Sequence, residues 1–273
     1  MSDDRLRADA ALVRRGLAPS REKAQALIAA GLATLNGMPI AKPAQKVAET
    51  DALAVTGTDH PYVGRGGLKL EKALEVFHAD VSGRVCMDIG ASTGGFTDVL
   101  LRNGALRVYA IDVGSGQLDP RLAADPRVVS MEHTNARTLT PEMFPELPTL
   151  AVMDVSFISI RLILPAAFAV LGDAGRMLCL VKPQFEAGRA DVGKRGLVSR
   201  PEVHVRVLRE LVAFVADLGW RVRVLDHSPV TGGDGNIEFL ADLLPAGSCP
   251  LPFDPSQIEA LVRCAHAALA GRG

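Results

Sequence analysis

Hydrophobic residues follow two different spacings along most of this chain. From residue 65 onward, short continuous apolar runs alternate with stretches in which apolar residues recur every three or four positions. The continuous runs are typical of buried strands, and the wider spacing is typical of amphipathic helices. The predicted strands are 84–88, 107–112, 128–130, 150–154, 176–181, 221–228 and 237–240. The predicted helices are 68–77, 95–103, 160–169, 201–218 and 255–270. This alternation predicts an α/β fold with a Rossmann-like, doubly wound sheet, and its last two strands form a reversed hairpin.

The first 58 residues have a different pattern, typical of a small α+β domain. The predicted elements are helices 6–15 and 20–30 followed by strands 32–35 and 38–40. Asn36-Gly37 lies between the two strands and is a strong signal for a tight hairpin turn. A polar, turn-rich stretch follows this block. We therefore expect a small domain at 1–58, a linker at 59–63 and an α/β domain at 64–273.

The composition narrows the class of protein. The chain has 273 residues, of which 48% are hydrophobic, so both domains can bury a full core. Its four cysteines form no CxxC pair, and Cys86 and Cys179 lie in apolar strands, as expected of buried thiols in a reducing compartment. The N-terminus lacks the apolar segment of a signal peptide, and no run of about 18 apolar residues is present. We expect a cytoplasmic protein with no metal and no membrane partner.

The N-terminal block is basic, although the formal net charge of the whole chain is only −1. Its basic residues from 5 to 46 are Arg5, Arg7, Arg14, Arg15, Arg21, Lys23, Lys42 and Lys46. Only Asp9 and Glu22 oppose them in that stretch. A second basic series comprises Lys182, Arg189, Lys194, Arg195, Arg200 and Arg206. Such groups favour RNA phosphates, and with aromatic residues at 4% we expect recognition of RNA shape rather than base stacking. The alternative is that these arginines merely solvate helix faces.

A glycine-rich loop joins one predicted strand to the next helix. The strand ends at Asp88, the loop spans 90–95, and the helix opens at Phe96. Glycines at a helix N-terminus expose backbone N–H groups to a ligand. A carboxylate beside them would repel the pyrophosphate of a nicotinamide cofactor, which disfavours an oxidoreductase. Asp88 instead suits an amine, such as that in the methionine part of S-adenosylmethionine.

Polar residues end the neighbouring strands at the edge where such sheets bind ligands. Asp112 ends the second strand and suits the two hydroxyls of an adenosine ribose, and Asn135 follows the third strand, where it could meet the adenine edge. Asp154 and Lys182 end the fourth and fifth strands. Burial disfavours the charged form of a lysine and lowers its pKa. A lysine that acts as a base needs such a lowered pKa. The alternative is a lysine whose charged end reaches solvent at the sheet edge.

The residues around Asp154 also restrict the methyl acceptor. Enzymes that methylate base amino groups usually follow the fourth strand with an Asn/Asp-Pro-Pro-aromatic run, and the sequence after Asp154 has no proline there. Carbon methylation of pyrimidines needs a cysteine nucleophile, and neither Cys86 nor Cys179 lies at a strand end. Hydroxyl methylation remains.

Several segments together resemble one family. Those segments are 62–70, 88–97, 154–159, 181–186 and 232–239. They are similar to the TlyA family of ribosomal RNA ribose 2'-O-methyltransferases, which are often named hemolysins and belong to the wider FtsJ class. Segments 14–21 and 35–37 resemble the alpha-L RNA-binding domain. The resemblance covers nearly the whole chain.

The resemblance implies a Lys-Asp-Lys-Glu catalytic tetrad, S-adenosylmethionine as cofactor, and ribosomal RNA or a ribosomal subunit as partner. By motif position the tetrad is Lys69, Asp154, Lys182 and Glu238. The expected cofactor-binding residues are Asp88, Gly90, Ala91, Ser92, Gly94, Gly95, Phe96, Asp112, Val113, Asn135 and Asp154. The expected RNA-binding residues are Arg5, Arg7, Arg14, Arg15, Arg21, Lys23, Arg65, Lys194 and Arg195.

Two other functions remain as alternatives. The hemolysin name implies a membrane-lytic protein, but the sequence offers no spanning segment and no long helix with a strongly cationic face. A non-catalytic RNA-binding protein could keep a degenerate methyltransferase fold. The intact tetrad, together with Asp88 and Asp112, argues against that alternative.

Overall fold

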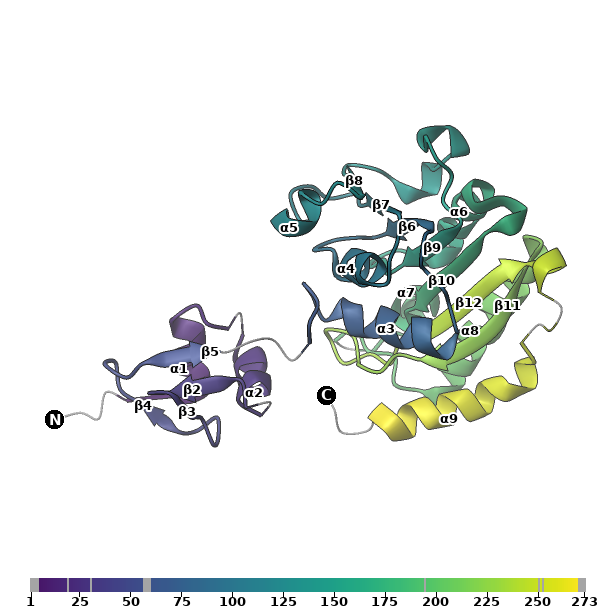
Figure 1. The fold of residues 1–273 in the computed structure, drawn as a ribbon. Helices are drawn as coiled ribbons and strands as arrows, with labels where there is room; N and C mark the ends of the chain where they lie inside the picture. The colour runs from purple at the N-terminus through teal and green to yellow at the C-terminus, as the bar shows by residue number, and fades with distance from the viewer. Residues whose placement is uncertain are drawn as a thin grey trace. The chain divides into compact units, whose positions relative to one another are not determined.

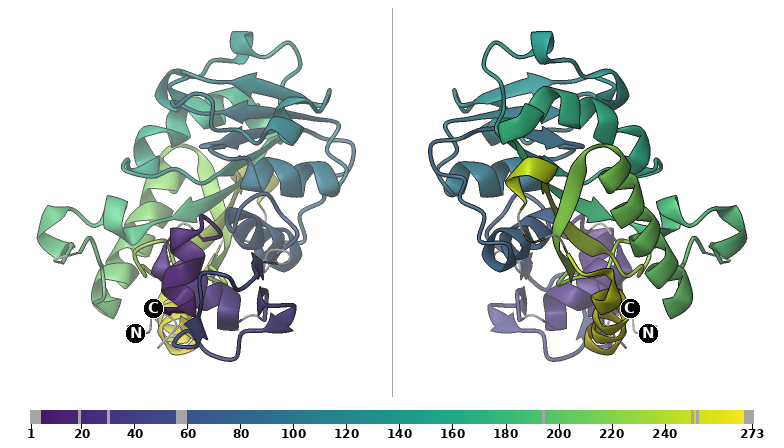
Figure 2. Two further views of the ribbon diagram at one scale, coloured as in Figure 1. Left: turned by 90° about the vertical axis from the view of Figure 1, so that its left-hand side faces the viewer. Right: turned by 90° about the vertical axis from the view of Figure 1, so that its right-hand side faces the viewer.

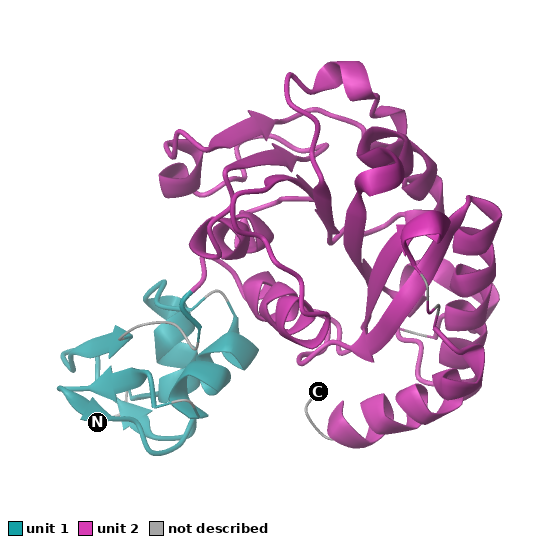
Figure 3. Cartoon of the chain, turned by 45° about the vertical axis from the view of Figure 1, so that its right-hand side comes forward, with its two compact units in different colours: residues 1–61 teal, residues 62–273 magenta. Residues whose placement is uncertain are grey.

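The protein consists of two compact units, Met1–Pro61 and Tyr62–Gly273 (Figure 3). The computed structural model describes residues 5–18, 20–29, 31–55, 60–193, 195–249, 251 and 253–269. Each unit has its own hydrophobic core within these residues. The two units are therefore described separately.

The second unit is built on a seven-stranded sheet (Figure 1). Its strands are β6 (Val85–Ile89), β7 (Arg107–Ile111), β8 (Val128–Met131), β9 (Leu150–Met153), β10 (Arg176–Val181), β11 (Trp220–His227) and β12 (Phe239–Pro245). Their order is β11-β12-β10-β9-β6-β7-β8. Strands β8, β7, β6, β9 and β10 pair in parallel, whereas β12 is antiparallel to both β10 and β11. The predicted fold class and the reversed hairpin are confirmed.

Helices cover both faces of this sheet (Figure 2). One face packs on α3 (Gly66–Val76) and α4 (Gly95–Arg102), and the other on α6 (Leu164–Leu171), α8 (Pro201–Asp217) and α9 (Ile258–Leu269). Successive strand residues divide between the two cores, as Cys86 and Met87 of β6 do. Because both faces of the central strands are buried, a strand such as β9 is apolar at every position rather than at alternate ones.

Several elements of this unit differ from the sequence prediction. The short helices α5 (Pro120–Ala123) and α7 (Pro183–Glu186) were not predicted, and α7 begins directly after Lys182. The predicted helix 160–169 is a 3₁₀ turn, Ile160–Leu162, followed by α6, which has a proline in its first turn. Strand β12 runs to residue 245, beyond the predicted 237–240. The prediction ended too early because Asp242 interrupts the apolar pattern. That carboxylate is fully buried and pairs with Arg176 and Arg223.

The first unit combines two helices with short strands. Its elements are β1 (Leu6–Arg7), α1 (Ala8–Arg14), α2 (Arg21–Ala29), β2 (Ala33–Leu35), β3 (Met38–Pro39), β4 (Lys46–Val47) and β5 (Leu53–Val55). Strands β3, β2 and β5 form one antiparallel sheet, and β1 pairs with β4. The predicted helix start at residue 6 was wrong, because Leu6 and Arg7 pair with Val47 and Lys46. A two-residue strand is too short to show a periodic pattern.

Across the part of the chain that the structure describes, no helix is both long and apolar enough to cross a membrane.

Candidate active site

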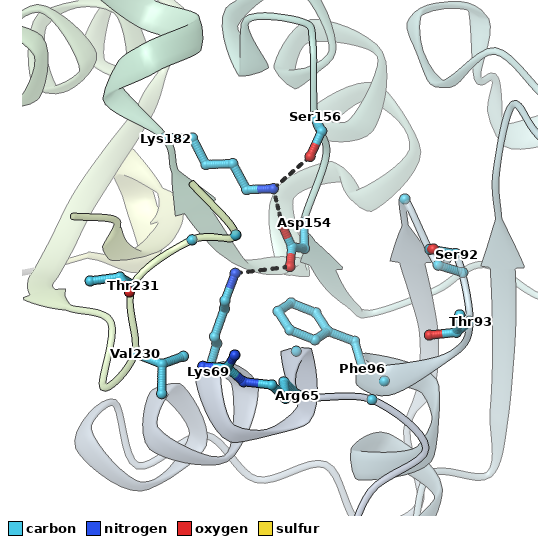
Figure 4. A pocket seen from close by; sticks show the side chains of 17 residues that line it. Arg65, Lys69, Ser92, Thr93, Phe96, Asp154, Ser156, Lys182, Val230 and Thr231 are labelled. Carbon is cyan, nitrogen blue, oxygen red and sulfur yellow. Dashed lines mark hydrogen bonds and ion pairs between the residues drawn. The ribbon is translucent and has the colours of Figure 1, made fainter. Parts of the chain in front are cut away.

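Four charged side chains from separate segments meet at the edge of the sheet where β9 and β10 end. Lys182 Nζ lies 2.5 Å from Asp154 Oδ1, and Lys69 Nζ lies 3.6 Å from Asp154 Oδ2 (Figure 4). Lys69 Nζ also donates a hydrogen bond to Glu238 Oε2 at 2.6 Å. The antiparallel direction of β12 brings Glu238, which directly precedes that strand, to this same edge. The four residues form a continuous line of alternating charges.

The two lysines of this line have different surroundings. Burial lowers the pKa of Lys69, but the charges of Asp154 and Glu238 and its hydrogen bonds to both outweigh that effect, so its pKa is raised overall. Lys69 therefore remains an ammonium between two carboxylates. Lys182 contacts only one of the carboxylates, Asp154, and its Nζ also donates to the Ser156 hydroxyl at 2.9 Å. Lys182 thus has one carboxylate and one hydroxyl as partners, whereas Lys69 has two carboxylates.

A cavity of about 360 Å³ lies between this charged line and the glycine-rich loop. Its walls include Lys69, Asp154 and Lys182 on one side and backbone of the 90–95 loop on the other. Figure 4 shows the Phe96 ring between Lys69 and that loop. A cavity of this size matches the lower range of small-molecule sites. It brings a candidate cofactor surface next to the tetrad.

Two glycines of the loop occupy positions that a side chain would not tolerate. Gly90 has φ +84°, and a Cβ there would lie 2.6 Å from the Asp154 carbonyl oxygen. Gly94 has φ +95°, and a Cβ there would lie 2.3 Å from Leu122 Cδ1. Both combine a left-handed backbone with a close neighbour. The loop therefore passes close to Asp154 because it carries no side chain at residue 90.

Asp88 does not line this cavity, although the sequence predicted that it contacts the cofactor. It is fully buried, and its Oδ2 accepts a hydrogen bond from the Thr97 hydroxyl at 2.7 Å. Its Oδ1 has no hydrogen-bond partner among the described residues. Burial raises the pKa of Asp88 to about 7, against a smaller lowering by the Thr97 hydrogen bond. The group is an acid that is easily protonated near neutral pH.

Asp112 lies beside a second, smaller hollow. Its two carboxylate oxygens accept hydrogen bonds from the backbone N–H groups of Ser92 and Gly114, both at 2.8 Å. The Ser92 hydroxyl donates to Gln117 Oε1 at 3.2 Å, and the Gln117 side chain lies close against Gly114. The remaining volume is only about 10 Å³. In this structure Gln117 fills the hollow next to Asp112.

Two further expected cofactor residues lie outside both cavities. The Val113 side chain is 75% exposed. Asn135 Oδ1 accepts a hydrogen bond from the Arg137 N–H at 3.1 Å and so caps a 3₁₀ turn. Their expected contacts with a nucleoside remain predictions.

The sequence matches two families that together cover most of the chain. The FtsJ-like methyltransferase family matches residues 62–243, and the S4 domain matches residues 6–53. The "16S/23S rRNA (cytidine-2'-O)-methyltransferase TlyA" of Mycobacterium tuberculosis is 48% identical over 236 residues, covering 86% of this chain and 88% of that protein. The chain belongs to the TlyA family of FtsJ-like methyltransferases.

Other members of the family are equally similar. The Bacillus subtilis protein YqxC, whose name describes an rRNA methyltransferase, is 50% identical over 244 residues, covering 89% of this chain and 87% of that protein. A solved structure of a hemolysin-named protein from Streptococcus thermophilus is 46% identical and covers 98% of both chains, with a TM-score of 0.79. The expected family and its N-terminal RNA-binding domain are confirmed.

Within the S4 domain, three of the expected RNA-binding arginines make internal contacts. The fully buried Asp9 accepts hydrogen bonds from Arg7 at 3.0 Å and from Arg21 at 3.1 Å. The hydrogen bond from Arg7 is the main cause that holds the pKa of Asp9 far below its usual range. Arg15 donates to the backbone carbonyls of Ala48, Glu49 and Asp51. These arginines therefore also stabilise the domain.

The other expected RNA-binding residues are mostly at the surface. Arg14 lies 3.7 Å from Glu49, with both side chains largely exposed. Arg5 is exposed and Lys23 is half-buried. Arg65 is exposed and lines the cavity, and Arg195 is exposed in the second unit. Lys194 lies outside the described residues.

Sequence reasoning missed two parts of the site. Ser156, which accepts a hydrogen bond from Lys182, lines the cavity two positions after Asp154. The segment 230–233 forms another wall, and a Cβ at Gly232 would lie 2.6 Å from Glu238 Oε1. The sequence signals were a hydroxyl just after a strand-end carboxylate and the Gly232-Gly233 pair before Glu238.

Proposed function

We propose that this chain transfers a methyl group from S-adenosylmethionine to a ribose 2' hydroxyl of ribosomal RNA. The observation that carries the proposal is the line Lys182–Asp154–Lys69–Glu238 beside a cavity walled by the glycine-rich loop. The names of the TlyA and YqxC relatives support ribosomal RNA as the substrate and the cytoplasm as the compartment.

The residues around the cavity fit the proposed cofactor. The Gly90 and Gly95 backbone leaves room for a ligand, and Phe96 offers an aromatic face. Asp112 keeps outward lone pairs for a ribose, because each of its oxygens accepts only one backbone N–H. The unpartnered Asp88 Oδ1 is a buried acceptor next to this loop. When bound, S-adenosylmethionine supplies an activated methyl group. Adenosine binding requires Gln117 to move, since that side chain fills the hollow beside Asp112.

The four residues of the tetrad have different roles in the proposed reaction. A ribose hydroxyl is a weak nucleophile until its proton is removed. We assign that removal to Lys182 Nζ, which must first release a proton of its own, because it has one carboxylate partner whereas Lys69 has two. Asp154 holds Lys182 in place, and Lys69 and Glu238 position the ribose electrostatically. Lys182 has a side-chain exposure of only 9%, so a base-paired target nucleotide must leave its helix to reach it.

The test is transfer of labelled methyl from S-adenosylmethionine to separated ribosomal subunits. The expected product is one or more 2'-O-methylated riboses, located by primer-extension stops at low nucleotide concentration. The Lys182→Ala variant should bind cofactor normally but transfer methyl groups at least about 100-fold more slowly. Unchanged transfer by this variant would overturn the role of Lys182.

Two other outcomes would overturn the proposed function itself. Cofactor binding without methyl transfer to any ribosomal RNA would favour a non-catalytic RNA-binding protein. Leakage of liposomes caused by the pure protein, without methyl transfer, would favour the membrane-lytic alternative.

A further inference from the structure

A buried carboxylate joins the two segments that follow Asp154 and Lys182. Glu186, on α7, accepts a hydrogen bond from the Ser159 hydroxyl at 2.7 Å through Oε2. Its Oε1 accepts a hydrogen bond from the Ile160 N–H at 2.8 Å. The Glu186 side chain is 3% exposed, and neither it nor Ser159 lines the cavity.

The cost of burying Glu186 is offset only while the two segments stay together. Burying a carboxylate costs several kcal/mol unless hydrogen bonds and a counter-charge replace its water. Both oxygens of Glu186 are satisfied by the segment that follows Asp154, and Arg161 Nε of that segment lies 3.7 Å from Oε2. Separation of the segments would therefore leave a buried charge without these partners.

The segment that Glu186 holds also contacts Lys182. Ser156 accepts a hydrogen bond from Lys182 Nζ, and the Phe157 ring lies 5.4 Å from the Phe185 ring of α7. Phe157 has φ +65°, a left-handed conformation that is costly for a bulky residue, yet its side chain is 92% exposed. Such strain persists only where surrounding contacts enforce it. The Glu186 contacts hold Ser159 and Ile160, which are two and three residues after Phe157.

We propose that Glu186 and Ser159 form a clamp that sets the distance between Asp154 and Lys182. Glu186 is then a positioning residue for the reaction, because it acts through the 155–160 loop and does not reach the cavity. The inference rests on the proposed function of this site.

The main test compares Glu186→Ala with Glu186→Gln in the full-length protein. Glu186→Ala removes both hydrogen bonds and should lower kcat by about 10- to 100-fold, the cost of a misplacement of about 1 Å. Its Kd for S-adenosylmethionine should stay within about twofold, since the glycine-rich loop is untouched. Glu186→Gln should retain most activity, because a glutamine can accept from the Ile160 N–H and donate to the Ser159 hydroxyl.

Ser159 provides an independent variant of the same clamp. Ser159→Ala removes one of the two hydrogen bonds and should lower kcat less than Glu186→Ala does. The double variant should lose less than the sum of the two single losses, because both changes remove the Glu186–Ser159 hydrogen bond, and Ser159→Ala in addition removes only the bond that Ser159 Oγ accepts from the Arg161 N–H. Additive losses in the double variant would contradict a shared clamp. Should Glu186→Ala fail to fold, a lower kcat of Ser159→Ala than of Glu186→Gln still tests the clamp, and a wild-type kcat in Ser159→Ala would contradict it.

Asp242→Asn is a matched control for lost stability. Asp242 is also a buried carboxylate, but it pairs with Arg176 at the start of β10, whereas Lys182 follows the end of that strand. This variant should lower Tm while kcat per folded molecule stays unchanged. If Asp242→Asn lost as much kcat as Glu186→Ala, general destabilisation would explain both losses. That result would overturn the clamp.

Hydrogen exchange gives a readout that does not depend on activity. Glu186→Ala should speed exchange of the Ile160 amide and its neighbours in 155–161, and Asp242→Asn should not. Unchanged exchange together with wild-type kcat in Glu186→Ala would overturn the clamp. If the wild-type protein transfers no methyl group, the proposed function fails, and the exchange measurement still decides whether the clamp holds the loop.

Discussion

At the residue scale, Lys69 and Lys182 carry the same chemical group, but their removal should have different effects on the rate of methyl transfer and on thermal stability. Lys182→Met should lower the single-turnover rate of methyl transfer by about 10²- to 10⁴-fold, the usual contribution of a general base. Lys69→Met should also slow transfer, and in addition it leaves the 2%-exposed Glu238 without its counter-charge. Breaking a buried ion pair costs about 3–5 kcal/mol, so thermal melting should show a larger loss for Lys69→Met than for Lys182→Met, because Asp154, the partner of Lys182, is 18% exposed and keeps Lys69 as a counter-charge. Similar melting losses in both variants would contradict this division.

Asp88 should make stability depend on pH in an unusual direction. Its pKa rises from 3.8 to about 7 on folding, so between these values the unfolded chain loses the proton while the folded chain keeps it. The contribution of Asp88 to stability should therefore fall as pH rises from about 4 to 7 and then level off, with a cost of at most about 4 kcal/mol.

Asp88→Asn tests this prediction because it removes the titration while keeping an acceptor for Thr97. Urea unfolding from pH 4 to 8 should show a smaller decline for this variant than for the wild type. Thr97→Val, which removes the hydrogen-bond donor without removing the carboxylate, should keep the decline. An unchanged decline in Asp88→Asn would show that other groups cause it.

At the element scale, the sequence predicted what depends on local pattern and missed what depends on a partner. The predicted strand 176–181 coincides with β10 because burial on both faces makes every residue of that strand after Arg176 apolar. Strand β12 was misplaced because Asp242 is polar, and its burial depends on Arg176 and Arg223, which are distant in sequence. Short elements such as β1 and α7 contain too few residues for any periodicity.

The same distinction applies to the candidate site. The tetrad could be named from motifs, and strand ends of a parallel sheet meet at one edge, so Asp154 and Lys182 were expected to be close. The seclusion of Asp88 and the filling of the Asp112 hollow by Gln117 depend on side-chain packing. That packing follows from tertiary contacts and has no counterpart in residue spacing.

The contact between α8 and α9 should loosen in acid. His204 is fully buried, and its two ring nitrogens lie 3.0 Å from His266 Nε2 and from the Val198 carbonyl. Burial, with a smaller contribution from His266, lowers the pKa of His204 from 6.5 to about 4. As pH falls from 6.5 to 4, the unfolded chain takes up this proton first, so about 3 kcal/mol of stability should be lost.

His204→Gln tests this second pH dependence because it removes the titration while a side-chain donor for the Val198 carbonyl remains. Between pH 6.5 and 4 the wild type should lose about 3 kcal/mol of unfolding free energy relative to His204→Gln, with each protein referred to its own value at pH 8, because the opposite contribution of Asp88 is common to both proteins. Hydrogen exchange of α9 at pH 5 should be faster in the wild type than at pH 8. An equal acid sensitivity in His204→Gln would contradict the assignment.

At the scale of the whole molecule, a formal net charge of −1 has to be reconciled with RNA as the proposed partner. The structure divides the basic residues of the S4 domain into two groups. Arg7, Arg15 and Arg21 make internal contacts, whereas the side chain of Arg14 is largely exposed and pairs at 3.7 Å with Glu49, which is itself largely exposed. Affinity for RNA should then depend on a few exposed cations rather than on the total charge.

Arg14→Gln and Arg15→Gln form a matched pair that tests this division. Arg14→Gln should weaken binding to ribosomal subunits, reduce the slope of log K against log salt by about one, and leave the melting curve unchanged. Arg15→Gln should destabilise the first unit by about 1–2 kcal/mol, because three backbone carbonyls lose a charged donor. Neither variant should alter the Kd for S-adenosylmethionine, since the cavity residues all belong to the second unit. A changed cofactor Kd in Arg14→Gln would mean that the two units do not divide RNA binding and cofactor binding between them.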